Sequence, residues 1–543
     1  MFFAHRSVLV VGLLFITAAC STIREAPAPP LGKVPTASQA IESTGAAKGP
    51  DVFESRDFLV AIAKAGDTPE TLATRYLGDP KKKWMIEDFS GARLVSEGQE
   101  VVIPKRDWNR VGVFPWGYQL VPVLVYHNIS ATEKGKLSIA VRNFESQMRQ
   151  LHDGGFQTVS LADFLAFTAG RQQLPRRSVL LAFDDGYRSF IHYALPILRN
   201  YGFRATLFVY SDFVGGGVNA LSWADLRTLR EQGMDVQAHS KTHSNLRRKE
   251  GEAEKAYAKR MEVELGYPLT LFNKYLGHSS ESLAYPYGEA DDELLGYVAK
   301  YGYGAAFTVR RQSNPSFVAP LKISRSQIYA EMTAQDFAKN LIVFEDQELQ
   351  AATPDRKLSR TRGAAEAPPV SGEAVAARGP SSRDRLVTAH NERSEQLEQG
   401  GLLRQSLNER SIALTISPDD RMAQDAKKRL ESRIEQEVAA LLHDGRALLD
   451  RGVMGEAQQR FLTALSLDPM NRTAFETLQN EVREVMFINH TVRPGETCDS
   501  VAELYYGDRL RCEVIKDSNP RVQFRVGQKI RIPDIPGVPL LLH

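Results

Sequence analysis

Two adjacent carboxylates and one pair of histidines are the side chains of this sequence that are best suited to chemistry. Asp184 and Asp185 directly follow the apolar run of residues 179–183, and neighbouring carboxylates repel each other unless a metal ion or a proton separates their roles. Among the eleven histidines, only His239 and His243 are four positions apart. That spacing predicts a helical turn with both imidazoles on one face, as two ligands of one metal ion require.

Carboxylate oxygens and neutral imidazoles together form a ligand set for zinc or a similar divalent ion. Three protein ligands of this kind leave a coordination position open for water. A third motif, Tyr285-Pro286-Tyr287-Gly288, predicts a rigid turn whose backbone N–H groups could face an oxyanion. The sequence therefore predicts a divalent metal site with an anion-binding turn beside it.

Each of these motifs follows a stretch that has the length and composition of a β-strand. Apolar strands alternate with amphipathic stretches between about residues 119 and 345, which predicts an α/β fold with parallel strands. Such sheets and barrels carry their sites at the carboxyl ends of the strands. The expected strands are Pro122–Tyr126, Ser178–Phe183, Ala205–Tyr210, Asp235–Ala238, Ser282–Tyr285 and Ala305–Val309.

The three motifs, in their order along the chain, resemble those of carbohydrate esterase family 4, the NodB-type polysaccharide deacetylases. The resemblance covers residues 118–345 and implies a distorted (β/α) barrel. It also implies that Asp185, His239 and His243 bind the metal and that Asp184 is the general base. The backbone N–H of Tyr287 would hold the oxyanion of the attacked acetamide.

Two departures from the family pattern leave roles to be filled. Ala284 stands where family members commonly have an arginine that orients the base, and Arg325 is our candidate to replace it. No histidine between His278 and His390 supplies the usual late general acid. His127 is a candidate for that role, although a structural histidine at a strand end explains it equally well. The opening Tyr126-His127 is most similar to the poly-N-acetylglucosamine deacetylase branch.

An internal repeat links the two ends of the chain. Four short motifs recur at one constant offset of 429 positions, for example Gly66-Asp67-Thr68 at Gly495-Glu496-Thr497 and Ile103-Pro104 at Ile532-Pro533. Each copy has the pattern strand, helix, helix, strand and resembles the LysM module, which binds N-acetylglucosamine-containing glycans. The expected modules are residues 55–106 and 488–535; an asparagine usual in the family is present in the second copy as Asn519.

Between these modules we expect a helical segment and two linkers. Residues 424–485 have the spacing of a tetratricopeptide-like helix pair, in which the small residues Gly445 and Ala457 allow close helix approach. This segment is interpreted as a spacer or as a docking surface for a protein partner. Residues 21–54 and 346–410 are poor in apolar periodicity and are expected to be a flexible tether and a disordered linker.

The first twenty residues predict export and anchoring. A short apolar run and small residues lead into Cys20, which resembles a bacterial lipobox whose cysteine is acylated. The alternative is an ordinary secretory signal that ends near a cysteine. Ser21 is not the aspartate that retains lipoproteins at the inner membrane, so we expect an outer-membrane anchor facing the periplasm. In that oxidising compartment Cys498 and Cys512 could form a disulfide or remain two thiols.

The charge balance argues against nucleic-acid binding, because 68 lysines and arginines face 66 acidic residues. The predicted architecture is an α/β distorted (β/α) barrel flanked by two small βααβ LysM modules and a short α-helical tetratricopeptide-like segment. The predicted function is metal-dependent N-deacetylation of an N-acetylglucosamine-containing envelope polysaccharide, either peptidoglycan or an exopolysaccharide. The alternatives are an inactive glycan-binding scaffold and an O-acetyl esterase.

Overall fold

The computed structural model describes residues 52–91, 93–132, 134–349, 382–482, 487–519 and 522–541. The predicted signal with Cys20 lies outside the described residues, as does the predicted tether up to Asp51. Among the described residues, no helix has the length and apolar character needed to cross a membrane.

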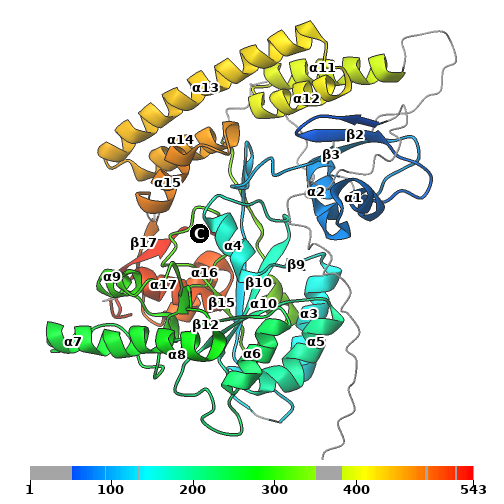
Figure 1. The fold of residues 1–543 in the computed structure, drawn as a ribbon. Coiled ribbons are helices and arrows are strands. Elements are labelled where there is room, and N and C mark those ends of the chain that lie inside the picture. Colours follow the sequence, from blue (N-terminus) through cyan, green and yellow to red (C-terminus); the bar gives the residue numbers. More distant parts are fainter. Residues whose placement is uncertain are drawn as a thin grey trace, which may run out of the picture. The chain divides into compact units, whose positions relative to one another are not determined.

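A parallel sheet is the centre of the α/β domain (Figure 1). The order of its strands in space is β14, β13, β12, β11, β10, β6, β15, with β9 (Gln157–Thr158) paired to the start of β10. The bounds of these strands are β6 Val123–Tyr126, β10 Ser178–Asp185, β11 Thr206–Val209, β12 Asp235–Ala238, β13 Ser282–Ala284, β14 Ala305–Phe307 and β15 Ser326–Gln327. The first six correspond to the strands expected from the sequence.

The sheet curls, and one short segment after β14 pairs with strands at both of its ends. Ile323 forms an isolated parallel bridge with Phe307 of β14. A few residues later, β15 pairs in parallel with β6 at the other end of the strand order. The curled parallel sheet agrees with the α/β fold expected from the sequence.

The strands are apolar because helices and loops cover the sheet on both faces. All eight residues of β10 are buried, which is typical of a central parallel strand. Helices follow the strands in alternation, and several begin at a serine or aspartate whose side chain accepts a hydrogen bond from the first turn, as Ser222 and Asp291 do. The helices are α3 Val141–Asp153, α4 Leu161–Thr168, α5 Leu195–Asn200, α6 Trp223–Glu231, α7 Glu254–Met261, α8 Tyr267–Leu276, α9 Asp292–Lys300 and α10 Ala334–Ala338.

Short strands complete this domain. They form a sheet of β4, β5 and β16 and a pair of β7 and β8. Their bounds are β4 Val113–Phe114, β5 Gly117–Gln119, β7 Asn128–Ser130, β8 Ser138–Ala140 and β16 Phe344–Asp346.

The two repeated segments share the order strand, helix, helix, strand, and the first has one additional strand before it. The first contains β1 Val52–Glu54, β2 Phe58–Ile62, α1 Pro69–Leu77, α2 Lys83–Ser90 and β3 Glu100–Pro104; the second contains β17 Phe487–Thr491, α16 Cys498–Tyr506, α17 Cys512–Ser518 and β18 Lys529–Pro533. Thr68 and Thr497 cap the first helix of each copy with a capping box, and left-handed Gly78 and Gly507 end it. Strand β1 lies in the predicted tether, so the first unit begins earlier than expected.

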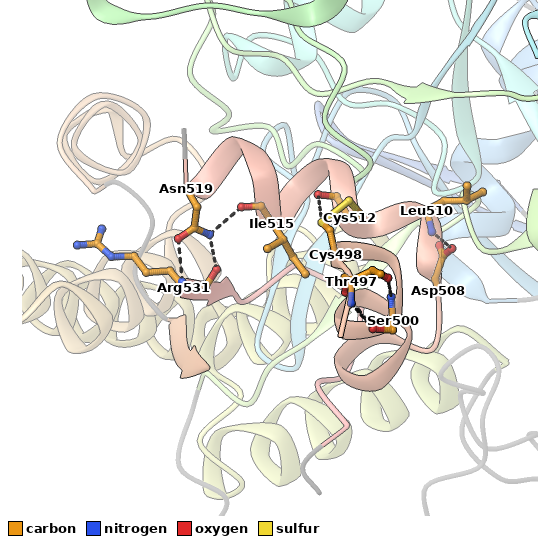
Figure 2. The surroundings of a disulfide bond; sticks show 9 residues. All are labelled: Thr497, Cys498, Ser500, Asp508, Leu510, Cys512, Ile515, Asn519 and Arg531. Atoms are coloured by element: carbon orange, nitrogen blue, oxygen red, sulfur yellow. Dashed lines mark hydrogen bonds between the residues drawn. A yellow bond between two sulfur atoms is a disulfide. The ribbon is translucent and has the colours of Figure 1, made fainter. Parts of the chain in front are cut away.

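The second copy is closed by a disulfide and by an internal hydrogen-bond network (Figure 2). Cys498 and Cys512 are joined, with their Cα atoms 5.3 Å apart. The side-chain amide of Asn519 donates to the carbonyls of Ile515 and Arg531, and its oxygen accepts from the Arg531 N–H. Asn519 therefore fastens the end of α17 to β18.

Within residues 382–482, the structure has five helices: α11 Ser382–Gln399, α12 Leu403–Ile416, α13 Arg421–Asp450, α14 Met454–Leu467 and α15 Arg472–Asn480. The last three cover the predicted helix pair, and a Cβ added at Gly445 would lie 2.9 Å from the ring of Phe461. The disordered linker predicted for residues 346–410 is wrong from Ser382 onward, because α11 and the first half of α12 occupy that range.

Candidate active site

Adjacent parallel strands bring the three sequence motifs to one edge of the sheet. In register, Asp185 of β10 is paired with Val209 of β11, and Val209 with Ala238 of β12. His239 directly follows that position, and the turn Pro286–Gly288 follows the end of β13. Residues more than fifty positions apart therefore converge because their strands end at the same level.

Asp185, His239 and His243 offer ligand atoms that all lie within 4.8 Å of one another. The Oδ1 atom of Asp185 is 3.7 Å from His239 Nε2 and 3.4 Å from His243 Nε2. His239 Nδ1 lies 2.7 Å from the carbonyl oxygen of Ala284. A nitrogen at that distance must donate its proton, which leaves Nε2 as a lone-pair donor turned toward the carboxylate.

The donor set fits a divalent cation. Asp185 Oδ1 is buried and has no hydrogen-bond partner among the described residues, and such an orphaned oxygen is costly unless a ligand satisfies it. Burial lowers the pKa of His239 to about 4 and also lowers that of His243, so both imidazoles are neutral and able to bind a metal. Burial and the charge of Asp184 raise the pKa of Asp185 to about 7, and a cation beside that carboxylate would lower it again.

The helical turn predicted for His239–His243 is wrong. Ser240 and His243 adopt left-handed backbone conformations, with φ of 69° and 60°. The segment is a loop in which the N–H of His243 donates to Ser240 Oγ over 3.0 Å. Both imidazoles still point to one place, but strained loop residues achieve this rather than helical periodicity.

Glu264, which the sequence analysis did not single out, holds this loop in place. Its carboxylate is buried and accepts hydrogen bonds from the N–H groups of Lys241 and Thr242 and from the Thr242 hydroxyl, at 2.6–3.1 Å. These two residues lie between the histidines. Nothing in the sequence distinguished Glu264 from a solvated glutamate on a helix surface.

Asp184 is held by a fully buried arginine. Arg325 Nη1 and Nη2 donate to the two carboxylate oxygens of Asp184 over 2.7 and 2.9 Å, and Arg325 Nε donates to the Thr308 carbonyl. Burial raises the pKa of Asp184, but the charge and hydrogen bonds of Arg325, together with the charges of His239 and His127, outweigh it and lower the pKa to about 2. Asp184 is therefore an ionised carboxylate 3.7 Å from His239 Nε2, able to accept a proton beside the donor set.

His127 and Tyr287 border the same site. His127 is half-buried, its Nδ1 has no hydrogen-bond partner among the described residues, and burial lowers its pKa to about 4. Tyr287 adopts φ of 62° in its turn, and its exposed ring centroid lies 4.9 Å from that of His243. The structure thus brings together the residues that the sequence analysis proposed for the site. They are Asp184, Asp185, His239, His243, Tyr287, His127 and Arg325.

Comparison with known proteins agrees with this geometry. The model of the family described as "Polysaccharide deacetylase" matches residues 171–306, which contain all three motifs. The chain contains a polysaccharide deacetylase domain. The model of the LysM domain matches residues 490–533, the second βααβ unit.

Curated relatives of the deacetylase domain carry the same description. A Bacillus subtilis protein named a polysaccharide deacetylase, YxkH, is 27% identical over 35% of this chain, and the match spans 64% of that relative. The poly-beta-1,6-N-acetyl-D-glucosamine N-deacetylase of Staphylococcus aureus is 27% identical over 37% of this chain and 72% of its own length. The enzyme class expected from the motifs is that of these relatives.

Solved structures of deacetylases align with the same part of the chain. The Streptococcus pyogenes deacetylase PplD is 22% identical with a TM-score of 0.38, covering 41% of this chain and 98% of its own. IcaB from Ammonifex degensii is 23% identical with a TM-score of 0.37, covering 41% of this chain and 97% of its own.

Proposed function

We propose that this chain hydrolyses N-acetyl groups of an N-acetylglucosamine-containing polysaccharide in the bacterial cell envelope. The observation that carries the proposal is the pairing of two unlike carboxylates at the end of β10. Asp184 is kept ionised by Arg325, whereas Asp185 is turned toward His239 and His243 with an unpartnered oxygen. One carboxylate is thus equipped as a base and the other as a ligand.

The chain's own residues provide the proton transfers. A divalent ion held by Asp185, His239 and His243 would acidify water and polarise the acetamide carbonyl. Asp184 accepts a proton from the attacking water, whose oxygen forms the bond to the acetyl carbon. The backbone N–H of Tyr287 faces the oxyanion that develops. The C–N bond then breaks, and the products are acetate and a free glucosamine amine.

The amine nitrogen must gain a proton as it leaves. His127 interacts electrostatically with Asp184 and is neutral at pH 7, because its pKa is lowered to about 4. We assign His127 as the relay that takes the proton from Asp184 and passes it to the amine. Its unpartnered Nδ1 is the observation that favours this role over a purely structural one.

The remaining parts of the chain fit an envelope glycan as substrate. The LysM domain at residues 490–533 and the naming of the Staphylococcus aureus relative support N-acetylglucosamine polymers. The first βααβ unit, with the same caps and helix ends, is proposed as a second LysM module. Acylation of Cys20 would anchor the chain at the outer membrane facing the periplasm, and helices α13–α15 are proposed as a tetratricopeptide-like docking surface for a protein partner.

The decisive test is acetate release from chitin, peptidoglycan and poly-N-acetylglucosamine fragments, with and without a chelator. We expect release that needs a divalent metal such as zinc, and Asp184→Asn should lower kcat at least about a hundredfold, a typical loss for a general base, while metal content is unchanged. The matched control is Asp153→Asn, an exposed aspartate at the end of α3. Glycan binding without acetate release would indicate a scaffold, and release from O-acetylated glycans only would indicate an esterase; either result overturns the proposal.

A further inference from the structure

A row of aromatic rings extends from the metal-ligand site along one side. The ring of Tyr210 has its centroid 5.2 Å from that of His243. Phe213 stacks on Tyr210 at 5.3 Å with 16° between the planes, and Tyr187 meets Phe213 edge-on at 5.4 Å. Tyr287 also contacts His243, so four aromatic side chains make consecutive contacts through one metal-ligand histidine.

Three separate segments supply these rings, and each is tied to the site. Tyr187 is two residues beyond Asp185, and Tyr210 directly follows β11. Phe213 belongs to the loop of residues 211–222. This loop is fixed at both ends, because the N–H of Asp212 donates to Lys241 and the N–H of Leu221 donates to Gly186. The row therefore keeps its position relative to both ligand segments.

These aromatic rings are not core residues. Val209 before the loop and Leu221 near its end belong to the buried core of the domain. By contrast, Tyr187, Tyr210 and Phe213 are only half-buried and Tyr287 is 63% exposed. Aromatic rings usually cluster because they bury apolar surface in a core. Here only part of the surface of each ring is buried. The rest is aromatic surface available beside a catalytic site.

Chemistry indicates what kind of ligand suits such a surface. A pyranose ring presents an apolar C–H face bounded by hydroxyl groups, and aromatic side chains with polar edges match that combination. A charged pair joins this loop to the segment of the ligand histidines: Lys241 Nζ is 2.7 Å from Asp212 Oδ2. Its groups can exchange hydrogen bonds with hydroxyls at the edge of a stacked sugar.

We propose that Tyr187, Tyr210 and Phe213 form a subsite that stacks a second pyranose of the same glycan, adjacent to the sugar whose acetamide is hydrolysed. This rests on the proposed function. Binding energy from a sugar that does not react would position the reacting one and raise kcat/KM for long chains over short ones. The subsite thus gives the enzyme a preference for polymer over single sugars.

Phe213→Leu is the sharpest test, because leucine keeps apolar volume in the loop but removes the flat ring. With N-acetylglucosamine itself and its β-1,4- and β-1,6-linked hexamers, we expect kcat/KM for the hexamers to fall about tenfold and that for the single sugar less than twofold. The thermal midpoint and metal content should be unchanged, and Phe213→Tyr should retain wild-type values. Tyr201→Ala is the control, since Tyr201 stacks on Phe203 just before β11, at the opposite end of that strand.

Equal losses for the single sugar and the hexamer would show that the ring only supports the loop, and no loss would show that it does not bind glycan; both overturn the subsite. Calorimetric titration of the hexamer into Asp184→Asn, with and without Phe213→Leu, separates this inference from the proposed function. A tenfold weaker Kd in the double variant supports the subsite even if the wild-type chain releases no acetate. An unchanged Kd rejects it even if deacetylation is robust.

Discussion

Neighbouring aspartates at the end of β10 have opposite electrostatic environments. Both are buried, and burial alone would raise both pKa values. Arg325, with the charges of His239 and His127, lowers the pKa of Asp184 below its ordinary value, whereas the negative charge of Asp184 raises the pKa of Asp185 further. The sequence letters Asp-Asp are identical, so the division of labour between base and ligand comes wholly from what each side chain contacts.

Arg325→Lys tests whether the role of Asp184 as a base depends on the geometry of its arginine partner or only on the positive charge. Lysine keeps the positive charge but cannot donate to both oxygens of Asp184 and to the Thr308 carbonyl at once. We expect kcat to fall roughly 10- to 100-fold with KM nearly unchanged, because a misoriented base loses stabilisation in the transition state only. Steady-state acetate release measures both constants.

A second buried arginine provides the control for that substitution. Arg311 is as fully buried as Arg325, but it contacts Asn340 and the Gln327 carbonyl instead of the carboxylates of the site. Arg311→Lys should lower the thermal midpoint by a similar amount and leave kcat within about twofold, as expected for an interaction outside the transition state. Similar kcat losses in both variants would mean that Arg325 acts through stability alone.

At the scale of elements, the turn after β13 depends on one glycine. A Cβ at Gly288 would lie 2.4 Å from the backbone nitrogen of Val309, and the residue has φ of 72°. Gly288→Ala should therefore destabilise the domain by about 1–3 kcal/mol and displace Tyr287. Gly296→Ala, in the open middle of α9, should stabilise it by about 0.4–1 kcal/mol. Urea unfolding of the two variants checks the opposite signs, and a neutral Gly288→Ala would disprove the steric argument.

The elements that the sequence predicted well are those with a long local pattern. Six strands could be assigned because continuous apolar runs identify buried parallel strands. Strand β15 has two residues, Ser326 and Gln327, and no pattern at all, although it brings Arg325 to Asp184. The turn at His239–His243 was misassigned because helical spacing and a left-handed loop can bring the same two residues together.

Across the whole molecule, a missed repeat explains the misplaced linker boundary. Ala413-Leu414-Thr415-Ile416-Ser417-Pro418 at the end of α12 recurs as Ala464-Leu465-Ser466-Leu467-Asp468-Pro469 at the end of α14, 51 positions later. Asp420 and Asn471, again 51 apart, cap the helices that follow. That periodicity was available in the sequence. Contacts between distant segments could not be predicted from the sequence, because no local pattern specifies a partner hundreds of residues away.

One such long-range contact is a buried histidine between two glutamates. His390 of α11 lies 2.7 Å from Glu100 of β3 and 2.6 Å from Glu409 of α12. Burial lowers the pKa of His390, but the two glutamates more than reverse this and raise it to about 9. Because the folded pKa lies above the ordinary 6.5, the contribution to stability is complete below pH 6.5 and is lost as the pH rises to about 9.

His390→Gln should remove this pH dependence. Calorimetry of the full chain should show a thermal midpoint that decreases as the pH rises from 6.5 to 9 in the wild type, because the free energy of unfolding falls by an amount on the order of 3 kcal/mol. In His390→Gln the thermal midpoint should be lower than that of the wild type at pH 6.5 and should change less between pH 6.5 and 9. His443→Gln, an exposed histidine on α13, should behave like the wild type. A wild-type midpoint that stays constant from pH 6.5 to 9 would show that His390 does not hold the first βααβ unit to the helices through its charge.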